Sequence, residues 1–133
     1  MRRLTGLPAC VAVAALLAGC SSRTGGPAPP PPPAEDLREL AGVYEYLAAQ
    51  GKPPPKKLED LREFGGGVLG AAWPKLESGD YVVFWGAGRA PGSSAVLAYE
   101  SKTPTDGGAV LLQDGTVTTM TAAEFQAARK AGR

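Results

Sequence analysis

Apolar residues recur along this chain with a helical spacing at first and with a strand-like spacing from residue 81 onward. Between residues 35 and 50 they fall on one face of a helix, at every third or fourth position. These positions are Leu37, Leu40, Ala41, Tyr44, Leu47 and Ala48. Gly51 is expected to end this helix, and Pro53-Pro54-Pro55 prevents its continuation. A second, short helix is predicted from Lys57 to Phe64, ending at Gly65-Gly66-Gly67.

Four segments rich in β-branched, aromatic and other apolar residues predict strands at 81–85, 95–99, 109–113 and 116–120. Asp114-Gly115 separates the last two and predicts a hairpin with a two-residue turn. In the expected register Leu112 faces Val117 and Val110 faces Thr119, which gives an apolar face to pack against the first helix.

The residues after the last strand predict the start of another helix. Thr121 and Glu124 have the spacing of a capping box, in which each side chain bonds to the other residue's backbone N–H. The helix is expected to continue to about Lys130. The predicted fold class is therefore α+β: an amphipathic helix packed on a small antiparallel sheet of about four strands, with a short C-terminal helix. This domain is expected to span residues 35–133.

The N-terminal residues carry the pattern of an export signal. Arg2 and Arg3 precede a mostly apolar stretch, and small residues lead up to Cys20. The segment Leu17-Ala18-Gly19-Cys20 closely resembles the lipobox of bacterial lipoproteins, in which the cysteine sulfur is lipidated. The resemblance implies a signal peptide over residues 1–19, cleavage between Gly19 and Cys20, and lipid attachment to Cys20.

Two other interpretations of this region, an uncleaved membrane-spanning helix and lipidation of Cys10, are weaker. The uninterrupted apolar run covers only Ala9 to Ala18, whereas a membrane-spanning helix needs about 20 residues. Cys10 follows Leu7-Pro8-Ala9, a poorer lipobox with too short an apolar segment before it.

Residues 20–34 predict a tether between the lipid and the domain. They include five successive prolines, Pro29 to Pro33, which favour the extended polyproline II conformation, and they contain little to bury. The alternative is that this proline-rich segment is itself a ligand that binds in a groove of a partner protein.

Composition excludes several functions. The chain has no histidine, the usual general base near neutral pH and the commonest metal ligand, and its net charge of +1 gives no basic stripe for nucleic acid. With Cys20 lipidated and Cys10 removed with the signal, no thiol is left for catalysis. We therefore expect a nonenzymatic protein without a cofactor. The remaining catalytic candidates are the pair Ser101-Lys102 and carboxylates drawn from Asp80, Glu100 and Asp106.

The glycines Gly65, Gly67 and Gly70 match the spacing GxGxxG of dinucleotide-binding loops. That motif must follow a strand and open a helix, whereas this one follows a predicted helix and leads toward Trp73-Pro74. We therefore interpret it as a loop.

The order of elements after residue 35 resembles the soluble part of type II secretion pseudopilins, from the helix with Tyr44-Glu45-Tyr46 to the small sheet. The segment 95–117 also resembles the C-terminal part of pilin-like proteins whose signature is a histidine, nine residues and Asp-Gly. Here Asp114-Gly115 is present, but Pro104 stands in place of the histidine. The resemblance therefore implies a pilin-like fold, but the role of the histidine is not carried over to this chain.

Two kinds of ligand site follow from these residues. Major pseudopilins bind calcium in a C-terminal loop, and Asp106 and Asp114 are weak calcium candidates because they supply oxygen ligands; the alternative is that both are turn residues. Trp85, beside the glycine-rich loop 86–92, is the residue that we expect first to contact a ligand. The alternative for the aromatic residues as a group is packing in the core.

These features predict a noncatalytic, lipid-anchored cell-envelope protein with a structural or secretion-associated role, acting through an envelope protein partner. The alternative is a ligand-binding envelope module for a glycan or calcium. The domain is expected outside the cytoplasm, on the cell membrane or the outer membrane. Ser21 favours the outer membrane, because an aspartate after the lipidated cysteine often signals inner-membrane retention.

Overall fold

The computed structural model describes residues 32–133. The predicted signal peptide, Gly19, Cys20 and most of the predicted tether lie outside the described residues. The elements are α1 (Pro32–Ala49), the 3-10 helix η1 (Leu58–Phe64), α2 (Ala72–Ser78), β1 (Tyr81–Val83), β2 (Val96–Glu100), α3 (Thr103–Asp106), β3 (Gly108–Leu112), β4 (Val117–Met120) and α4 (Ala122–Ala127). The strands form one antiparallel sheet in the order β1-β2-β3-β4. The α+β fold class is confirmed.

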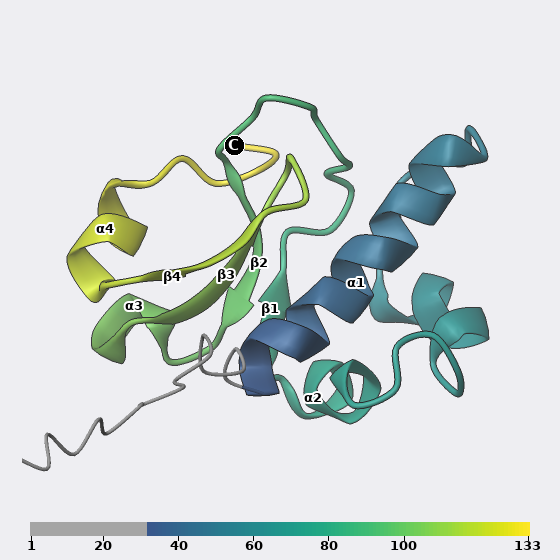
Figure 1. Ribbon diagram of the computed structural model, residues 1–133, viewed down its shortest axis with the longest axis horizontal. Helices are drawn as coiled ribbons and strands as arrows, with labels where there is room; N and C mark the ends of the chain where they lie inside the picture. The colour runs from purple at the N-terminus through teal and green to yellow at the C-terminus, as the bar shows by residue number, and fades with distance from the viewer. Residues whose placement is uncertain (1–31) are drawn as a thin grey trace, which may run out of the picture.

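Helix α1 lies along one face of the sheet (Figure 1). It begins at Pro32, three residues before the pattern predicted, because proline is well suited to the first turn of a helix. Most of its predicted apolar stripe is buried against the sheet, and Val43 belongs to it as well, but Ala41 is only partly buried and Ala48 is exposed. The fully or nearly fully buried residues of this stripe are Leu37, Leu40, Val43, Tyr44 and Leu47.

The two faces of the sheet contribute to two apolar clusters. Ala109 and Leu111 of β3 belong to the larger cluster, with α1. Val110 and Leu112 belong to the smaller one, with Phe125 of α4. The ring of Tyr99 lies 4.6 Å from that of Phe125, measured between centroids. Strand β3 is therefore buried on both faces, between α1 and α4.

The predicted register of the β3–β4 hairpin was wrong by one residue. Leu111 pairs with Val117, and Ala109 pairs with Thr119. The turn holds three residues instead of two: the N–H of Leu112 donates to the carbonyl of Thr116 at 2.8 Å, and Gly115 has a φ of 92°. A one-residue shift exchanges the faces of a strand, so Ala109 and Leu111, and not Val110 and Leu112, face α1.

The structure also differs from the prediction in its short helices and in where some helices and strands end. Helices α2 and α3 were not predicted, and β1 is three residues long where five were expected. Helix α4 begins with the predicted capping box of Thr121 and Glu124, which is confirmed. It ends at Ala127 and not near Lys130. The chain then runs beside β2, where the N–H of Val96 donates to the Arg129 carbonyl and the N–H of Ala131 donates to the Val96 carbonyl, each at 2.8 Å.

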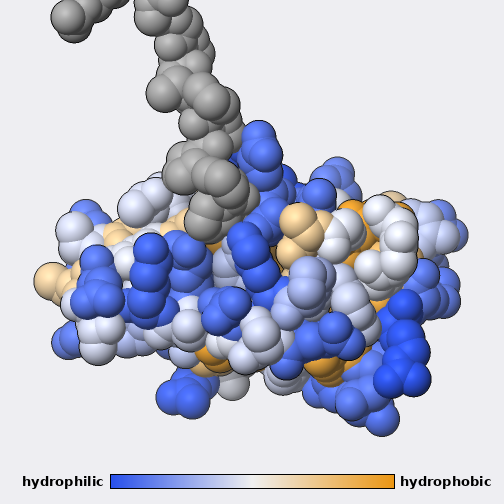
Figure 2. Space-filling model, turned by 90° about the horizontal axis from the view of Figure 1, so that it is seen from below, coloured by the Kyte–Doolittle hydropathy of each residue, from blue (hydrophilic) through white to orange (hydrophobic). Residues whose placement is uncertain are grey.

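Figure 2 shows the molecule from below the view of Figure 1, and this face is mostly hydrophilic, with small, separate apolar areas. Within residues 32–133, none of the helices combines the length and apolar character needed to cross a membrane.

The loop with the GxGxxG spacing packs against Trp73. It follows η1 and not a strand, as the sequence indicated. A Cβ atom added to Gly65 would lie 2.7 Å from the Trp73 ring, whereas a Cβ added to Gly66 meets no atom within 4 Å. Gly65 is thus required by the close approach of the indole ring.

We expect Gly65→Ala to lower the free energy of unfolding by about 1–3 kcal/mol, because the Trp73 ring must move. The matched control Gly66→Ala should change it by less than about 0.5 kcal/mol. Urea unfolding of the two variants checks this, and equal stabilities would contradict the packing described.

Candidate functional site

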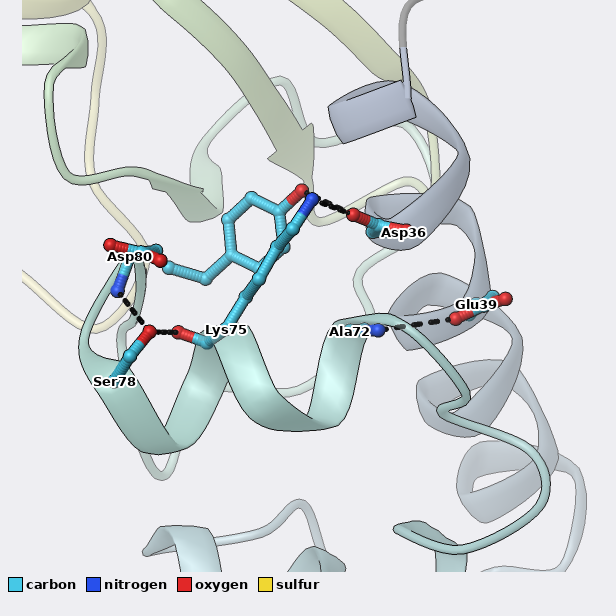
Figure 3. A network of polar contacts seen from close by, with 7 residues as sticks. Asp36, Glu39, Ala72, Lys75, Ser78 and Asp80 are labelled. Atoms are coloured by element: carbon cyan, nitrogen blue, oxygen red, sulfur yellow. Dashed lines mark hydrogen bonds and ion pairs between the residues drawn. The ribbon is translucent and has the colours of Figure 1, made fainter.

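A buried polar network joins α1, α2 and β1 (Figure 3). The side chain of Asp36 in α1 is almost fully buried and forms an ion pair with Lys75 of α2. The hydroxyl of Tyr81, the first residue of β1, donates to the same Asp36 oxygen at 3.2 Å. Burial and the negative charge of Asp36 raise the pKa of Tyr81, so its hydroxyl keeps its proton and remains a donor.

Further bonds of the network hold both ends of α2. No side chain of its own caps the helix start, but the Glu39 carboxylate accepts a hydrogen bond from the Ala72 N–H at 3.4 Å. A carboxylate is favoured there by the partial positive charge of a helix start. At the other end, the Ser78 hydroxyl donates to the Lys75 carbonyl and accepts from the Asp80 N–H. The network therefore explains how α2 is positioned.

Beside the network lies a cavity of about 350 Å³, lined by Lys75, Asp80, Tyr81, Glu100, Ser101 and Lys102. Ser101 and Lys102 both line it because β2 ends at Glu100, so these two residues lie in a turn and not in an extended strand. A Glu100 oxygen accepts a hydrogen bond from the Ala109 N–H at 2.7 Å. Asp106, the remaining catalytic candidate, is not part of this lining. Within residues 32–133 no hydrogen bond joins the Ser101 hydroxyl to Lys102, and an activated nucleophile needs such a bond to its base.

A second candidate site lies near the C-terminal end of α1. One cavity of about 330 Å³ is lined by Leu47, Lys52, Pro53, Pro54, Pro55, Lys56 and Asp60. A smaller one of about 150 Å³ is lined by Tyr44, Leu47, Ala48, Lys52, Pro54, Gly88 and Arg89. The two share Leu47, Lys52 and Pro54, and we call them together the proline groove.

Local sequence explains how the proline groove forms. Gly51 has a φ of 65° and turns the chain back after α1, where the Lys52 N–H donates to the Leu47 carbonyl at 2.9 Å. The carbonyl of Pro55 accepts a hydrogen bond from the Gly86 N–H at 2.8 Å, which ties the β1–β2 loop to the proline segment. Gly88 lies so close to Pro54 that an added Cβ would be 3.3 Å from it. The loop thereby forms the second wall.

Four of the five polar side chains that line the groove can donate hydrogen bonds: Tyr44, Lys52, Lys56 and Arg89. Arg89 donates to the Asp114 carbonyl at 2.7 Å and lies 3.4 Å from the exposed Glu45 carboxylate. Lys52 lies 5.8 Å from the ring centroid of Tyr46. The hydroxyl of Tyr44 is buried and has no hydrogen-bond partner among residues 32–133. Burial raises the pKa of Tyr44, so this hydroxyl also remains a donor.

The structure brings Trp85 close to this groove. Its side chain is 37% exposed in the turn after β1, directly before Gly86, which is bonded to Pro55. Trp85 does not line either cavity. Tyr46 is also exposed, whereas Tyr44 and Tyr81 are buried, so the aromatic residues divide between the core and the surface.

The structure does not bring the calcium candidates together. Asp106 precedes β3 and Asp114 follows it, so the two are separated by a strand of five residues, about 17 Å long. An Asp114 oxygen accepts from the Thr116 N–H at 2.8 Å; this bond lowers the pKa of Asp114 and is typical of a turn residue. Within residues 32–133 no group of three or more acidic, histidine or cysteine side chains could hold a metal ion.

The sequence analysis missed the main members of both sites. Asp36 and Lys75 are 39 positions apart, and nothing in either segment marks the other as its partner. Tyr44 was placed on the buried stripe of the first helix, but the cavity that it lines is completed by Gly88 and Arg89, more than 40 residues away. Of the glycines in that loop, Gly88 is the one that allows a close approach, because a Cβ added to it would lie 3.3 Å from Pro54.

Comparisons of the chain with models of protein families, with curated proteins and with solved structures found no match.

We expect Asp36→Asn to lower the free energy of unfolding at pH 7 by about 2 kcal/mol, between the values typical of exposed and buried ion pairs. The loss arises because Lys75, whose side chain is 34% exposed, keeps its charge without a partner. Urea unfolding measures the effect. Glu35→Gln, at an exposed position of the same helix, is the control and should change stability by less than about 0.5 kcal/mol. Equal effects of the two substitutions would contradict this role of Asp36.

Proposed function

We propose that this chain is a noncatalytic, lipid-anchored cell-envelope protein whose domain binds another envelope protein. The observation that carries the proposal is the segment Leu17-Ala18-Gly19-Cys20, which eleven residues, 21–31, separate from the start of α1 at Pro32. Several acyl chains on Cys20 hold a protein stably on a bilayer, because each buried methylene contributes about 0.8 kcal/mol.

The short spacing limits where the domain can act. The eleven residues 21–31 can span at most about 40 Å, since an extended chain covers up to about 3.6 Å per residue. The partner therefore lies within the envelope, close to the anchoring membrane. We propose the outer membrane for the anchor, because Ser21 follows Cys20 where aspartate often signals retention in the inner membrane.

The helix on an antiparallel sheet supports a pilin-like domain, but we do not propose assembly into a filament core. Such assembly depends on a long apolar N-terminal helix that packs between subunits. In this chain the apolar stripe of α1, including Leu37, Leu40 and Leu47, is already buried against the sheet. The domain is therefore proposed to act as a displayed binding unit.

A second candidate function is ligand binding, with a glycan as the ligand. The exposed ring of Trp85 beside the proline groove favours it, because sugars stack on exposed aromatic rings. The separation of Asp106 from Asp114 gives no comparable support for calcium.

Lipidation of Cys20 can be tested by mass measurement of the protein from membranes of cells fed an alkyne fatty acid. We expect the wild-type chain to begin at Cys20 and to carry the label. Cys20→Ala should lose the label and keep residues 1–19, because the modified sulfur directs cleavage. The control Cys10→Ala should be labelled and cleaved like the wild type. An unlabelled, full-length wild-type chain would disprove the anchor.

A further inference from the structure

The outer edge of strand β4 carries backbone groups that have no partner among residues 32–133. Strand β4 is the last in the order of the sheet, so it pairs with β3 on one side only (Figure 1). The Leu112 N–H donates to the Thr116 carbonyl, and bonded and non-bonded pairs alternate along an antiparallel ladder. In the observed register Thr118 is therefore bonded to β3, whereas the N–H and C=O groups of Val117 and Thr119 point away from it.

This edge lacks the features that usually keep exposed strands apart. Natural sheets protect an open edge with charged residues, prolines, very short strands or a covering segment. Strand β4 has the sequence Val-Thr-Thr-Met, and Thr118 and Thr119 are exposed. At the other border of the sheet, β1 has only three residues, and residues 129–131 bond to β2 beyond its end. Strand β4 is thus the edge at which another strand can pair.

An uncharged edge suits a second copy of the same edge. A charged partner strand would be matched by opposite charges along β4, and β4 has none. Two identical neutral edges meet without like-charge repulsion, and a two-fold axis lets one surface serve both sides of the contact. The tether is a poor alternative, because four of residues 21–31 are prolines, which have no N–H to donate.

One register uses all of the free groups. When Val117 lies opposite Thr119 of the second copy, each of the two pairs exchanges two hydrogen bonds. Placing Val117 or Thr119 opposite its own copy forms fewer bonds, because the Gly115 N–H and both backbone groups of Thr121 are already bonded within the chain. The favoured register puts Thr118 opposite Thr118 of the second copy, and such threonine pairs are themselves favourable.

The helices leave room for this pairing. Helix α1 lies mainly over β3, and Phe125 of α4 packs on Val110 and Leu112 of the same strand. Across the joined edges, the two β3 strands would be three strand spacings apart, which is about 14 Å. Packed helices need only about 8–10 Å between their axes. Neither α1 nor α4 therefore meets its counterpart before the edges pair.

We propose that two copies of this chain pair through the outer edges of β4, antiparallel and around a two-fold axis, so that their four-stranded sheets become continuous. The contact is small, and stable interfaces bury more than about 1,000 Å² in total. Confinement to a membrane by the lipid proposed on Cys20 raises the local concentration and favours the contact. The inference goes beyond the proposed function, and its geometry does not depend on the anchor.

Disulfide cross-linking in isolated membranes tests the register. In Thr118→Cys the two thiols face each other across a non-bonded pair, where the Cα atoms are about 4.5 Å apart and a disulfide fits. We expect oxidation with copper phenanthroline to give a dimer on a non-reducing gel. The exposed positions of Thr116→Cys and Thr119→Cys are the matched controls. Their copies would lie more than about 8 Å apart and should cross-link about tenfold more slowly. Maleimide labelling corrects for differences in thiol reactivity.

A proline substitution tests whether the backbone makes the contact. In the Thr118→Cys chain, Thr119→Pro removes an outward N–H and keeps the bonds to β3. Each copy then loses one hydrogen bond to the other, so the rate of cross-linking should fall about tenfold. Thr119→Val removes the hydroxyl, keeps the N–H and should cross-link like its parent. If urea unfolding shows that the proline destabilises the fold, the comparison of cysteine positions decides alone.

Three results would overturn the proposal. Thr118→Cys could react with maleimide and form no dimer, which would show an edge that is free or covered by another segment. Cysteines at 116, 118 and 119 could cross-link equally fast, which would show random collision. Thr118→Cys could instead form an adduct with a different protein, which would assign the edge to that partner.

The wild-type chain separates this proposal from the lipid anchor. It should form no disulfide dimer, because Cys20 is lipidated and Cys10 is removed with the signal. A wild-type dimer would reveal a free native thiol and would count against the anchor alone. The cysteine series is then repeated with Cys10→Ala and Cys20→Ala in the same chain, and the same comparison of positions decides the pairing.

Discussion

The burial of the apolar stripe of α1 against the sheet positions both candidate sites. Leu37, Leu40 and Leu47 fix the helix on the larger apolar cluster. Asp36, near the start of α1, is thereby held beside Lys75 and Tyr81, and Tyr44 is held beside the proline groove farther along the helix. Because one helix carries a member of each site, a shift of α1 on the sheet would disturb both.

Much of the fold could be predicted because its signals are local. The periodic stripe of α1 and the capping box of α4 each depend on residues within one or two turns, and both were found. The strands were located, but the hairpin register was not, because Asp114-Gly115 fits a two-residue turn as well as the three-residue turn that places Gly115 at a positive φ. Helix α2 was missed because Glu39 of α1 supplies the cap that its own sequence lacks.

The candidate sites were harder to predict, because they are defined by contacts between distant segments. Tyr44 has the spacing of a core residue, and a core tyrosine normally finds a partner for its hydroxyl. The cavity that Tyr44 lines is also bounded by Pro54 and by the loop with Gly88, and nothing in the sequence marks these segments as its neighbours. The same reasoning applies to Trp85, which was singled out from the sequence and lies next to the groove without lining it. For function, the strongest sequence signal, Cys20, and the candidate sites of the domain lie in separate parts of the chain.

The pairing of the last residues with β2 ties the carboxyl end of the chain to its core. Val96 is fully buried, and its N–H and carbonyl are bonded to Arg129 and Ala131. Unpaired backbone groups at such a position are costly, so the backbone of β2 is fully bonded only when residues 129–131 are in place. For a chain exported as we propose, folding cannot finish until those residues have left the export channel. This dependence on a late segment would thus keep the polypeptide unfolded during its passage across the membrane.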